Sequence, residues 1–549
     1  MTGTESGYGT GMAAAHPARG GSTPQPERAQ QPDRWRRAAA RAVLLVPGTV
    51  LLVADGYDLG RLSLWRDEAY TVDAAHRSLP QIFALLRHTD AVNSTYYMIM
   101  HADIALSGTS AAALRLPSLL AMAVAAVTVA AIGSRLARAA SLPAPALTGV
   151  LAGLLFAADP EVTRYAQEAR SYGLVTMCAT IATYLLLRAL GDGRRGWWVG
   201  YGVAIALAGL LNLLAFLLVA AHGVTVWVAR ARQRSMPQSP GLVRPVPVAS
   251  WLAAAGAAAA LLCPLLVLGI GERRQIGWLA RPGPHAVTHL VVAFAGAKPL
   301  VPLVALLAAG GVAASVTGRP RIPLDAATLA LPWLLLPAVI LLAVSQIHPL
   351  YDARYVVFSL PALALLVATG LAWLTRLVIR AAPGVNGAVA WLPAALVLAL
   401  LAVLTLGPQR SVRLQSSRPD NLRQASAIVA AHELPGDAVL YLPSNKRVFS
   451  MGYPAPFRRL RDVALGVPPV AAASLIGTAA PVPVLRARFA TVNRVWVVSG
   501  RGRKVFQHPT SRLEKAEVAL LRPFHVIGRW YVGQGMLSLY ARAQRPLAG

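Results

Sequence analysis

The chain has 549 residues, of which 56% are hydrophobic and only 14% are charged. Soluble domains carry about 25% charged residues, so this composition excludes an ordinary soluble protein. The formal net charge is +29, and only four of the 52 basic residues are lysines. Many of the arginines stand in short loops between apolar runs, where they orient helices and meet anionic lipid. The charge therefore does not indicate nucleic acid as a partner.

The first elements in chain order are a polar tail, one apolar run and a long loop. Residues 1–33 are rich in Gly, Ser, Pro and Gln, which predicts a disordered tail. The apolar run over about 38–54 follows several arginines, so we expect a cytoplasmic N-terminus and a helix that runs outward. Residues 55–112 then form the first external loop. Two amphipathic segments in it, 79–88 and 95–108, predict helices that lie on the membrane surface.

Apolar runs near the length that crosses about 30 Å of hydrocarbon recur along the rest of residues 34–407. Basic loops alternate with loops that hold acids, as orientation by charge requires. The later runs cover about 113–132, 145–158, 171–190, 197–230 (a hairpin turning near Asn212), 251–271, 299–316, 326–347, 356–376 and 388–406. We therefore predict an α-helical, multi-pass protein of the cell membrane with about eleven transmembrane helices.

Residues 408–549 change character, because their apolar runs are short. The segments "DAVLYL", "RVWVVSG", "HVIGRWYVG" and "MLSLYAR" have the composition of strands. The segment "DNLRQASAIVAAHE" predicts a helix with Asp420 as its N-cap. The sequence "SGRGRK" follows a strand, but two glycines do not make a dinucleotide loop, and we interpret it as a basic turn. We expect a small extracytoplasmic α/β domain.

Four loops on the predicted external side collect nearly all the acids near the membrane, together with arginines that orientation by charge does not explain. Asp67 and Glu68 are adjacent there, and carboxylates beside hydrocarbon are costly unless they have a role. The chemistry-bearing residues of the four loops are, in order, Asp67, Glu68, His88 and Asp90; Asp159, Glu161, Arg164, Gln167, Glu168, Arg170 and Tyr172; Arg273, Arg274 and Trp278; and His348, Tyr351, Asp352, Arg354 and Tyr355.

This mixture of acids and arginines suits two interpretations. A carboxylate that reaches a hydroxyl can act as a general base, and an arginine can hold a lipid phosphate and stabilise it as a leaving group. The same residues also suit salt bridges that pin the loops together. Spacing alone does not decide between the two.

Four motifs occur in a fixed order along the chain: "LWRDEAYT", "LSGTSAAALRLPSLLA", "RYAQEARSYGL" and "DARYVVFSLPALALL". In that order they resemble the C-type membrane glycosyltransferases, in particular the family 39 group with the protein O-mannosyltransferases and the aminoarabinose lipid A transferase. The resemblance covers about residues 40–375. The composition, rich in Ala and Arg and poor in Lys, resembles that of a high-GC actinobacterium.

The resemblance implies a polyprenyl-phosphate sugar donor and an inverting single displacement, with the catalytic acid in the long first external loop. By the match of the Asp-Glu pair, Asp67 is the expected base and Glu68 its catalytic neighbour. Arg354 is the candidate for the donor phosphate, with Arg164, Arg170 and Tyr355 as further donor-binding candidates. The remaining candidates for the substrate pocket are His88, Asp90, Asp159, Glu168, His348 and Asp352.

The expected function is transfer of a mannose-like or pentose sugar to an extracytoplasmic protein, glycolipid or polysaccharide, with membrane lipid as a further partner. The requirement for a divalent metal stays open, since no ligand spacing decides it. Two alternatives are a transporter or flippase of lipid-linked substrates and a non-catalytic membrane scaffold. A transporter typically has charged or broken helices near the midplane and an internal repeat, and the sequence shows neither.

Overall fold

The structure is a computed structural model and describes Gly7, Gly9 and residues 42–235, 246–271, 279–317, 324–502 and 504–543. Nearly all of the predicted tail, 1–33, lies outside the described residues. So do Arg273, Arg274 and Trp278 of the third predicted loop.

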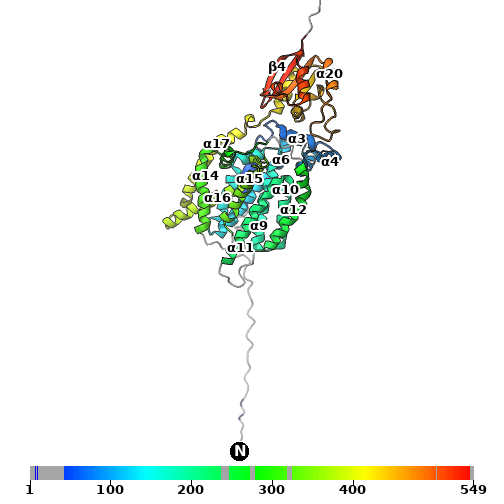
Figure 1. Cartoon of the computed structure of the whole chain (residues 1–549). Helices are drawn as coiled ribbons and strands as arrows, with labels where there is room; N and C mark the ends of the chain where they lie inside the picture. The colour runs from blue at the N-terminus through cyan, green and yellow to red at the C-terminus, as the bar shows by residue number, and fades with distance from the viewer. Residues whose placement is uncertain are drawn as a thin grey trace, which may run out of the picture. The chain divides into compact units, whose positions relative to one another are not determined.

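Apolar helices, most of them long, dominate the described residues between 43 and 412 (Figure 1). They are α2 (Val46–Gly56), α6 (Ala111–Ala139), α7 (Pro145–Ala157), α8 (Pro160–Ala166), α9 (Tyr172–Asp192), α10 (Arg195–Leu211), α11 (Leu218–Ser235), α12 (Val248–Gly271), α13 (Pro284–Ala295), α14 (Val301–Thr317), α15 (Ala326–Val344), α16 (Leu360–Ala381) and α17 (Leu392–Val412).

Eight helices within the described residues are long and apolar enough to cross a membrane, or nine if α7 and α8, bent by 67°, form one broken span. The chain is therefore a polytopic membrane protein. Each predicted span corresponds to an apolar helix, but α2 and α10 are shorter than a full span. The predicted hairpin breaks at Asn212, whose side chain accepts a hydrogen bond from the Leu214 amide. The sequence missed α13, which lies where a loop was expected.

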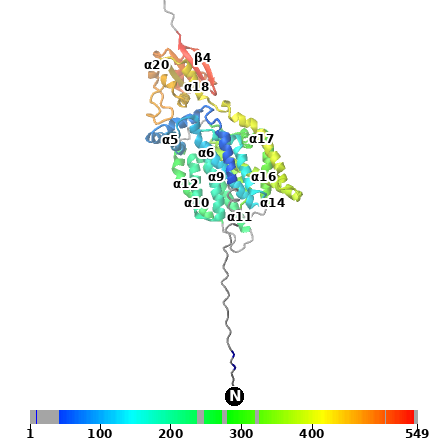
Figure 2. The ribbon, with the colours of Figure 1, turned by 180° about the vertical axis from the view of Figure 1, so that it is seen from behind.

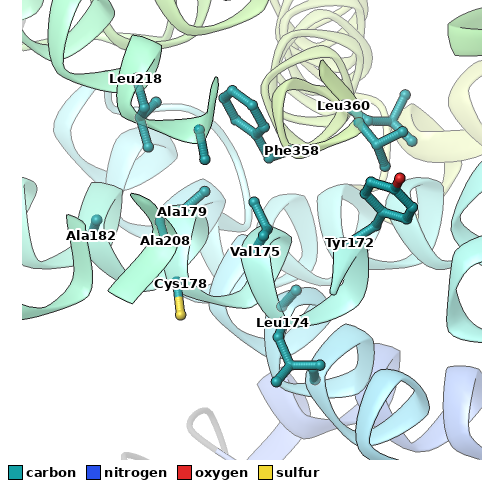
Figure 3. Packing of buried hydrophobic residues seen from close by; sticks show 14 of the residues in the cluster. Tyr172, Leu174, Val175, Cys178, Ala179, Ala182, Ala208, Leu218, Phe358 and Leu360 are labelled. Carbon is teal, nitrogen blue, oxygen red and sulfur yellow. The ribbon is translucent and has the colours of Figure 1, made fainter. Parts of the chain in front are cut away.

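Small residues allow the helices to approach closely. A side chain at Gly370 of α16 would place its Cβ 2.0 Å from the Leu307 carbonyl oxygen of α14. Figure 2 shows α2 packed against α6. Figure 3 shows α9 beside the 3₁₀ helix η7 (Ala353–Ser359), with Tyr172, Val175 and Phe358 in one buried cluster. This packing brings the loop before α9 close to the loop before α16.

The first long loop folds into three short α-helices, of which the last two correspond to the predicted segments 79–88 and 95–108, whereas the first was not predicted. They are α3 (Arg66–Ala75), α4 (Leu79–Leu86) and α5 (Ser94–Ser107). Helix α3 contacts both α5 and α19 of the C-terminal domain, so this loop joins the helical bundle to that domain.

The C-terminal domain is an α/β fold around one five-stranded sheet of order β2-β1-β3-β5-β4 (Figure 1). The strands are β1 (Ala438–Leu442), β2 (Arg461–Asp462), β3 (Arg494–Gly500), β4 (Phe524–Val532) and β5 (Gly535–Arg542), and the helices are α18 (Leu422–His432), α19 (Val448–Met451), α20 (Val482–Ala490), α21 (Lys504–Gln507) and α22 (Arg512–Leu520). All four predicted strands are present. The two-residue β2 is too short to give a sequence signal.

The two central parallel strands are buried on both faces. Val439 and Trp496 contribute to one apolar cluster, whereas Leu440 and Val497 contribute to another. One prediction for this domain was wrong: the N-cap of α18 is Asn421, whose side chain accepts from the Gln424 amide at 3.1 Å. The carboxylate of Asp420 instead forms an ion pair with Arg66 of α3, in the first long loop, and does not cap α18.

Candidate functional site

Asp67 lies in the first turn of α3 and faces the loop that precedes α16. Its Oδ2 is 2.9 Å from Nη1 of Arg354, and the Asp67 side chain is 19% exposed. Arg354 stands in η7, whose N-cap is Asp352. The Asp352 carboxylate accepts from the Arg354 amide at 3.2 Å and lies 3.3 Å from its guanidinium. One arginine therefore bridges two carboxylates from different loops.

Two further arginines, both predicted donor-binding residues, stand close to this pair. Arg170 donates from Nη1 to the Thr71 hydroxyl at 3.3 Å and to the Asp67 carbonyl oxygen at 3.5 Å. Arg164 is an electrostatic neighbour of Arg354. Within the described part of the chain, neither Arg164 nor Arg170 forms an ion pair with a carboxylate, and the Nε atom of each is buried without a hydrogen-bond partner. The site thus holds cationic groups that its own acids leave unpaired.

Aromatic rings line the same junction. The Arg354 guanidinium lies 5.5 Å from the centre of the Tyr355 ring, and Tyr355 lies 6.5 Å from Tyr172. Tyr172 in turn makes an edge contact with Tyr165 at 5.1 Å. These rings support the guanidinium and limit its freedom. Tyr355 therefore lies beside Arg354, and its role in donor binding stays a prediction.

Glu68 points away from Asp67 and is fully buried. Arg115 of α6 binds both of its oxygens at 2.8 Å, and the amides of Ala169 and Trp65 donate to them at 2.8 and 3.3 Å. Burial alone would raise the pKa of Glu68, but the Arg115 guanidinium and these donors outweigh it and hold the pKa below its ordinary value. The same guanidinium donates to the carbonyl oxygens of residues 59, 62 and 63. The predicted catalytic neighbour is thus an anchor of the first loop.

Glu168 is a second buried carboxylate, and its partner comes from the segment before the C-terminal domain. Arg418 donates to Oε2 of Glu168 and to the carbonyl oxygens of Arg164 and Gln167. Burial raises the pKa of Glu168 above its ordinary value, with Arg418 opposing that rise. The Oε1 atom has no hydrogen-bond partner among the described residues. Glu168 therefore fastens the second loop to residues 415–420.

Of the other predicted pocket residues, Asp90 lies close enough to the site to interact electrostatically with Arg170, as Asp67 does. Asp90 accepts from the Tyr97 hydroxyl and from Asn93 at 2.7 Å, and so shapes the start of α5. His88 and His348 are exposed at the ends of their helices. Asp159 is the N-cap of α8 and accepts from the Glu161 amide at 2.8 Å.

Asp159 also lies at the rim of an apolar cavity of about 280 Å³. Residues of α7, α13, α16 and α17 line this cavity, and Leu360, six residues after Arg354, is among them. The walls are almost entirely aliphatic. The cavity therefore suits an apolar chain that enters between the helices.

Three residues that sequence reasoning missed hold the site together: Arg115, Arg418 and Asp420. Arg115 stands in an apolar run, and an ionisable residue inside a membrane helix is itself a signal of a buried partner. Arg418 and Asp420 stand in a polar linker that gives no such signal. Asp420 accepts from Arg66 at 2.6 and 3.0 Å, which ties the linker to the residue before Asp67.

The described residues contain no group of three or more His, Cys, Asp or Glu side chains able to hold a metal ion. The requirement for a divalent metal, which the sequence did not decide, therefore stays open.

Comparison with known proteins agrees with this architecture. A family model described as dolichyl-phosphate-mannose-protein mannosyltransferase matches residues 95–251. No curated protein matches the sequence significantly. Among solved structures, ArnT from Cupriavidus metallidurans in the apo state is similar with a TM-score of 0.52 and 14% identity, over 92% of this chain and 98% of that chain.

The structure of the same ArnT bound to undecaprenyl phosphate also gives a TM-score of 0.52 at 14% identity, over 93% of this chain and 98% of that chain. The Archaeoglobus fulgidus oligosaccharyltransferase tethered with an acceptor peptide gives a TM-score of 0.41 at 14% identity, over 94% of this chain and 76% of that chain. The chain therefore has the fold of a C-type membrane glycosyltransferase, as its four ordered motifs predicted.

Proposed function

We propose that this protein is a membrane glycosyltransferase that moves a sugar from a polyprenyl-phosphate donor to an extracytoplasmic acceptor, with Asp67 as general base. The observation that carries the proposal is the pairing of Asp67 with Arg354 at 2.9 Å, beside two arginines without carboxylate partners in the described residues. A base beside unpaired cations is what transfer from a phosphate ester needs. The bound undecaprenyl phosphate in ArnT, which has the same fold, supports a donor of this class.

The reaction is a single displacement. The acceptor hydroxyl oxygen attacks the anomeric carbon of the sugar while Asp67 takes the hydroxyl proton. The bond between that carbon and the phosphate oxygen breaks from the opposite face, so the configuration inverts. The leaving polyprenyl phosphate gains negative charge, which Arg354, Arg170 and Arg164 stabilise.

The pairing of Asp67 with Arg354 gives donor binding a second effect. A donor phosphate that binds Arg354 competes with Asp67 for the same guanidinium. The Asp67 carboxylate is then free to accept a hydrogen bond from the acceptor hydroxyl. Asp352 remains as the partner that keeps Arg354 in place.

The apolar cavity beside α16 gives the donor's chain a place. A polyprenyl phosphate has its chain in hydrocarbon and its phosphate at the membrane edge. Leu360 lines the cavity and directly follows η7. Arg354 stands at the start of the same short 3₁₀ helix. A chain in the cavity would therefore leave its phosphate close to the three arginines.

The direct test supplies purified protein in lipid vesicles with a panel of radiolabelled polyprenyl-phosphate sugars, including mannose and pentose forms, and measures release of polyprenyl phosphate. Consumption of at least one donor, dependent on Asp67, is the expected result. If no donor of the panel is consumed and the labelled lipids appear instead on the other side of the vesicle membrane, the protein is a transporter of lipid-linked substrates.

A further inference from the structure

Two cavities adjoin on the side of the site that faces the C-terminal domain. One has a volume of about 590 Å³ and is bordered by Arg164 and by residues 415–421. The other has a volume of about 810 Å³ and is bordered by Arg66, Lys446 and Gly500–Gly502. Arg501 and Gln534 line both. We call the two together the basic groove, and both of its ends, at Arg164 and Arg66, lie beside the Asp67 site.

The charges of the basic groove are almost all positive. Arg66 and Arg418 have carboxylate partners, Asp420 and Glu168. Arg164, Arg501 and Lys446 have no such partner within the ranges that the structure describes. Among the described residues that line the walls, the one carboxylate is that of Glu514. It is occupied in the capping box of α22, whose N-cap is Ser511, and it accepts from the amide and the hydroxyl of Thr510 at 2.6 and 2.8 Å. Three cations without counter-ions in one groove favour an anionic ligand.

The fold places this groove where α/β sheets bind ligands. Lys446 follows β1, and the segment Gly500–Gly502 begins with the last residue of β3, so both stand at the carboxyl ends of adjacent parallel strands. In the strand order, β2 lies next to β1 toward one edge of the sheet, and β5 lies next to β3 toward the other edge. The strand order therefore reverses between β1 and β3, and ligands bind outside the strand ends at such a point. Ser499–Gly502, the described start of the segment "SGRGRK", lie at this edge, and Arg503 lies outside the described residues.

Neutral polar groups complete the walls. Ser416, Asn421, Gln424 and Gln534 line the groove with hydroxyl and amide groups. Such groups exchange hydrogen bonds with sugar hydroxyls, whereas a lipid chain needs the aliphatic walls found in the cavity beside α16.

We propose that the basic groove binds the acceptor and that this acceptor is an anionic oligosaccharide, bearing carboxylate or phosphate groups. The inference rests on the proposed glycosyl transfer, because it assigns the second substrate of that site. Arg501 and Lys446 bind the anionic groups, the amides and hydroxyls bind the sugar hydroxyls, and the chain of sugars leads one hydroxyl toward Asp67.

Equilibrium binding to the full-length protein in vesicles tests the groove without turnover. Four probes of equal length are compared: oligogalacturonate, a phosphorylated maltooligosaccharide, neutral maltooligosaccharide and oligoglutamate. The two anionic sugars are expected to bind more tightly than the neutral sugar and the acidic peptide. Whichever anionic sugar binds more tightly identifies the charged group. The variant Arg501→Glu with Lys446→Glu should weaken that binding by about tenfold or more, and Arg501→Gln alone should weaken it less.

Arg486→Glu is the matched control, because Arg486 is an exposed arginine of α20 in the same domain and lies outside both cavities. Its binding should equal that of the unaltered protein. Equal binding of neutral and anionic sugars, tighter binding of oligoglutamate, or equal loss in Arg486→Glu would each overturn the assignment. Transfer of the donor sugar to water reports separately on the proposed function, and it should be the same in the unaltered protein and in Arg486→Glu. Its absence from both would count against the enzyme and leave the binding result intact.

Discussion

Asp67 and Glu68 are neighbours in sequence, but the two sides of α3 that they occupy differ in almost every physical respect. Asp67 is 19% exposed and shares its partner Arg354 with Asp352. Glu68 is fully buried, and both of its oxygens bind Arg115. Successive helical residues point about 100° apart, so one turn can present a reactive group on one side and an anchor on the other. The comparison teaches that adjacent acids need not share a role, and four changes can test it.

The largest expected effect is a loss of turnover when Asp67 itself is changed. Asp67→Asn should lower the turnover rate by about 10²–10⁴-fold, the usual contribution of a general base. The melting temperature should change little, since the side chain is partly exposed and an amide can still accept from Arg354. Asp58→Asn is the control, because Asp58 is a carboxylate of the same loop with 46% exposure. Unchanged turnover in Asp67→Asn would remove Asp67 from the mechanism.

Arg354 tests whether the Asp67 side acts on the donor or only holds loops together. Arg354→Ala should lower the rate per folded molecule by about 10²–10³-fold, since a fixed cation at a leaving group contributes that much. Arg354→Lys should lose less, because the charge stays and only the forked geometry is lost. Arg87→Ala at the exposed end of α4 is the matched control. A lower melting temperature with a normal rate per folded molecule would reduce Arg354 to a structural ion pair.

Glu68→Gln should instead affect folding. The change removes one partner of a buried pair and leaves the Arg115 charge uncompensated, which typically costs about 3–5 kcal/mol of stability. Thermal unfolding of the purified protein should show a large drop in melting temperature, while the surviving folded fraction keeps its turnover rate within a small factor. Asp58→Asn removes one partner of an ion pair whose side chains are 61% and 46% exposed, and it should change stability by no more than about 1 kcal/mol. A stable Glu68→Gln protein with lost turnover would return Glu68 to the catalytic machinery.

The smallest expected effect is a pH dependence of the difference in melting temperature between the unaltered protein and Glu68→Gln. Because the pKa of folded Glu68 lies below its ordinary value, its stabilisation is complete above the ordinary pKa and is lost as the pH falls through the folded one. The gap in melting temperature between the unaltered protein and Glu68→Gln should therefore stay constant above about pH 5 and narrow below it. Other carboxylates titrate in both proteins and cancel in the difference. A gap that widens on acidification would mean that burial, not Arg115, dominates the pKa of Glu68.

Several parts of the fold followed from local pattern. The apolar runs correspond to the helices, the hairpin breaks at Asn212, and the four strand segments of the C-terminal domain pair in one sheet. These features depend on hydrophobicity and periodicity within a few turns of chain. Helix α13 was missed because its twelve residues are too few for a span and stand between charged and proline-rich segments.

The sequence by itself determined the membrane class, most of the spans and strands, and the external acids and arginines that include Asp67 and Arg354, because composition and spacing carry that information. Only the tertiary structure decided which of those charges meet. Arg354 reaches Asp67 across 287 residues, and Arg418 reaches Glu168 across 250. The sequence placed Asp67 and Glu68 in a loop, whereas the structure places them in α3 and turns Glu68 toward Arg115 and Asp67 toward Arg354. That choice depends on how α3 packs against α5, α6 and the C-terminal domain, and packing is a property of the whole chain.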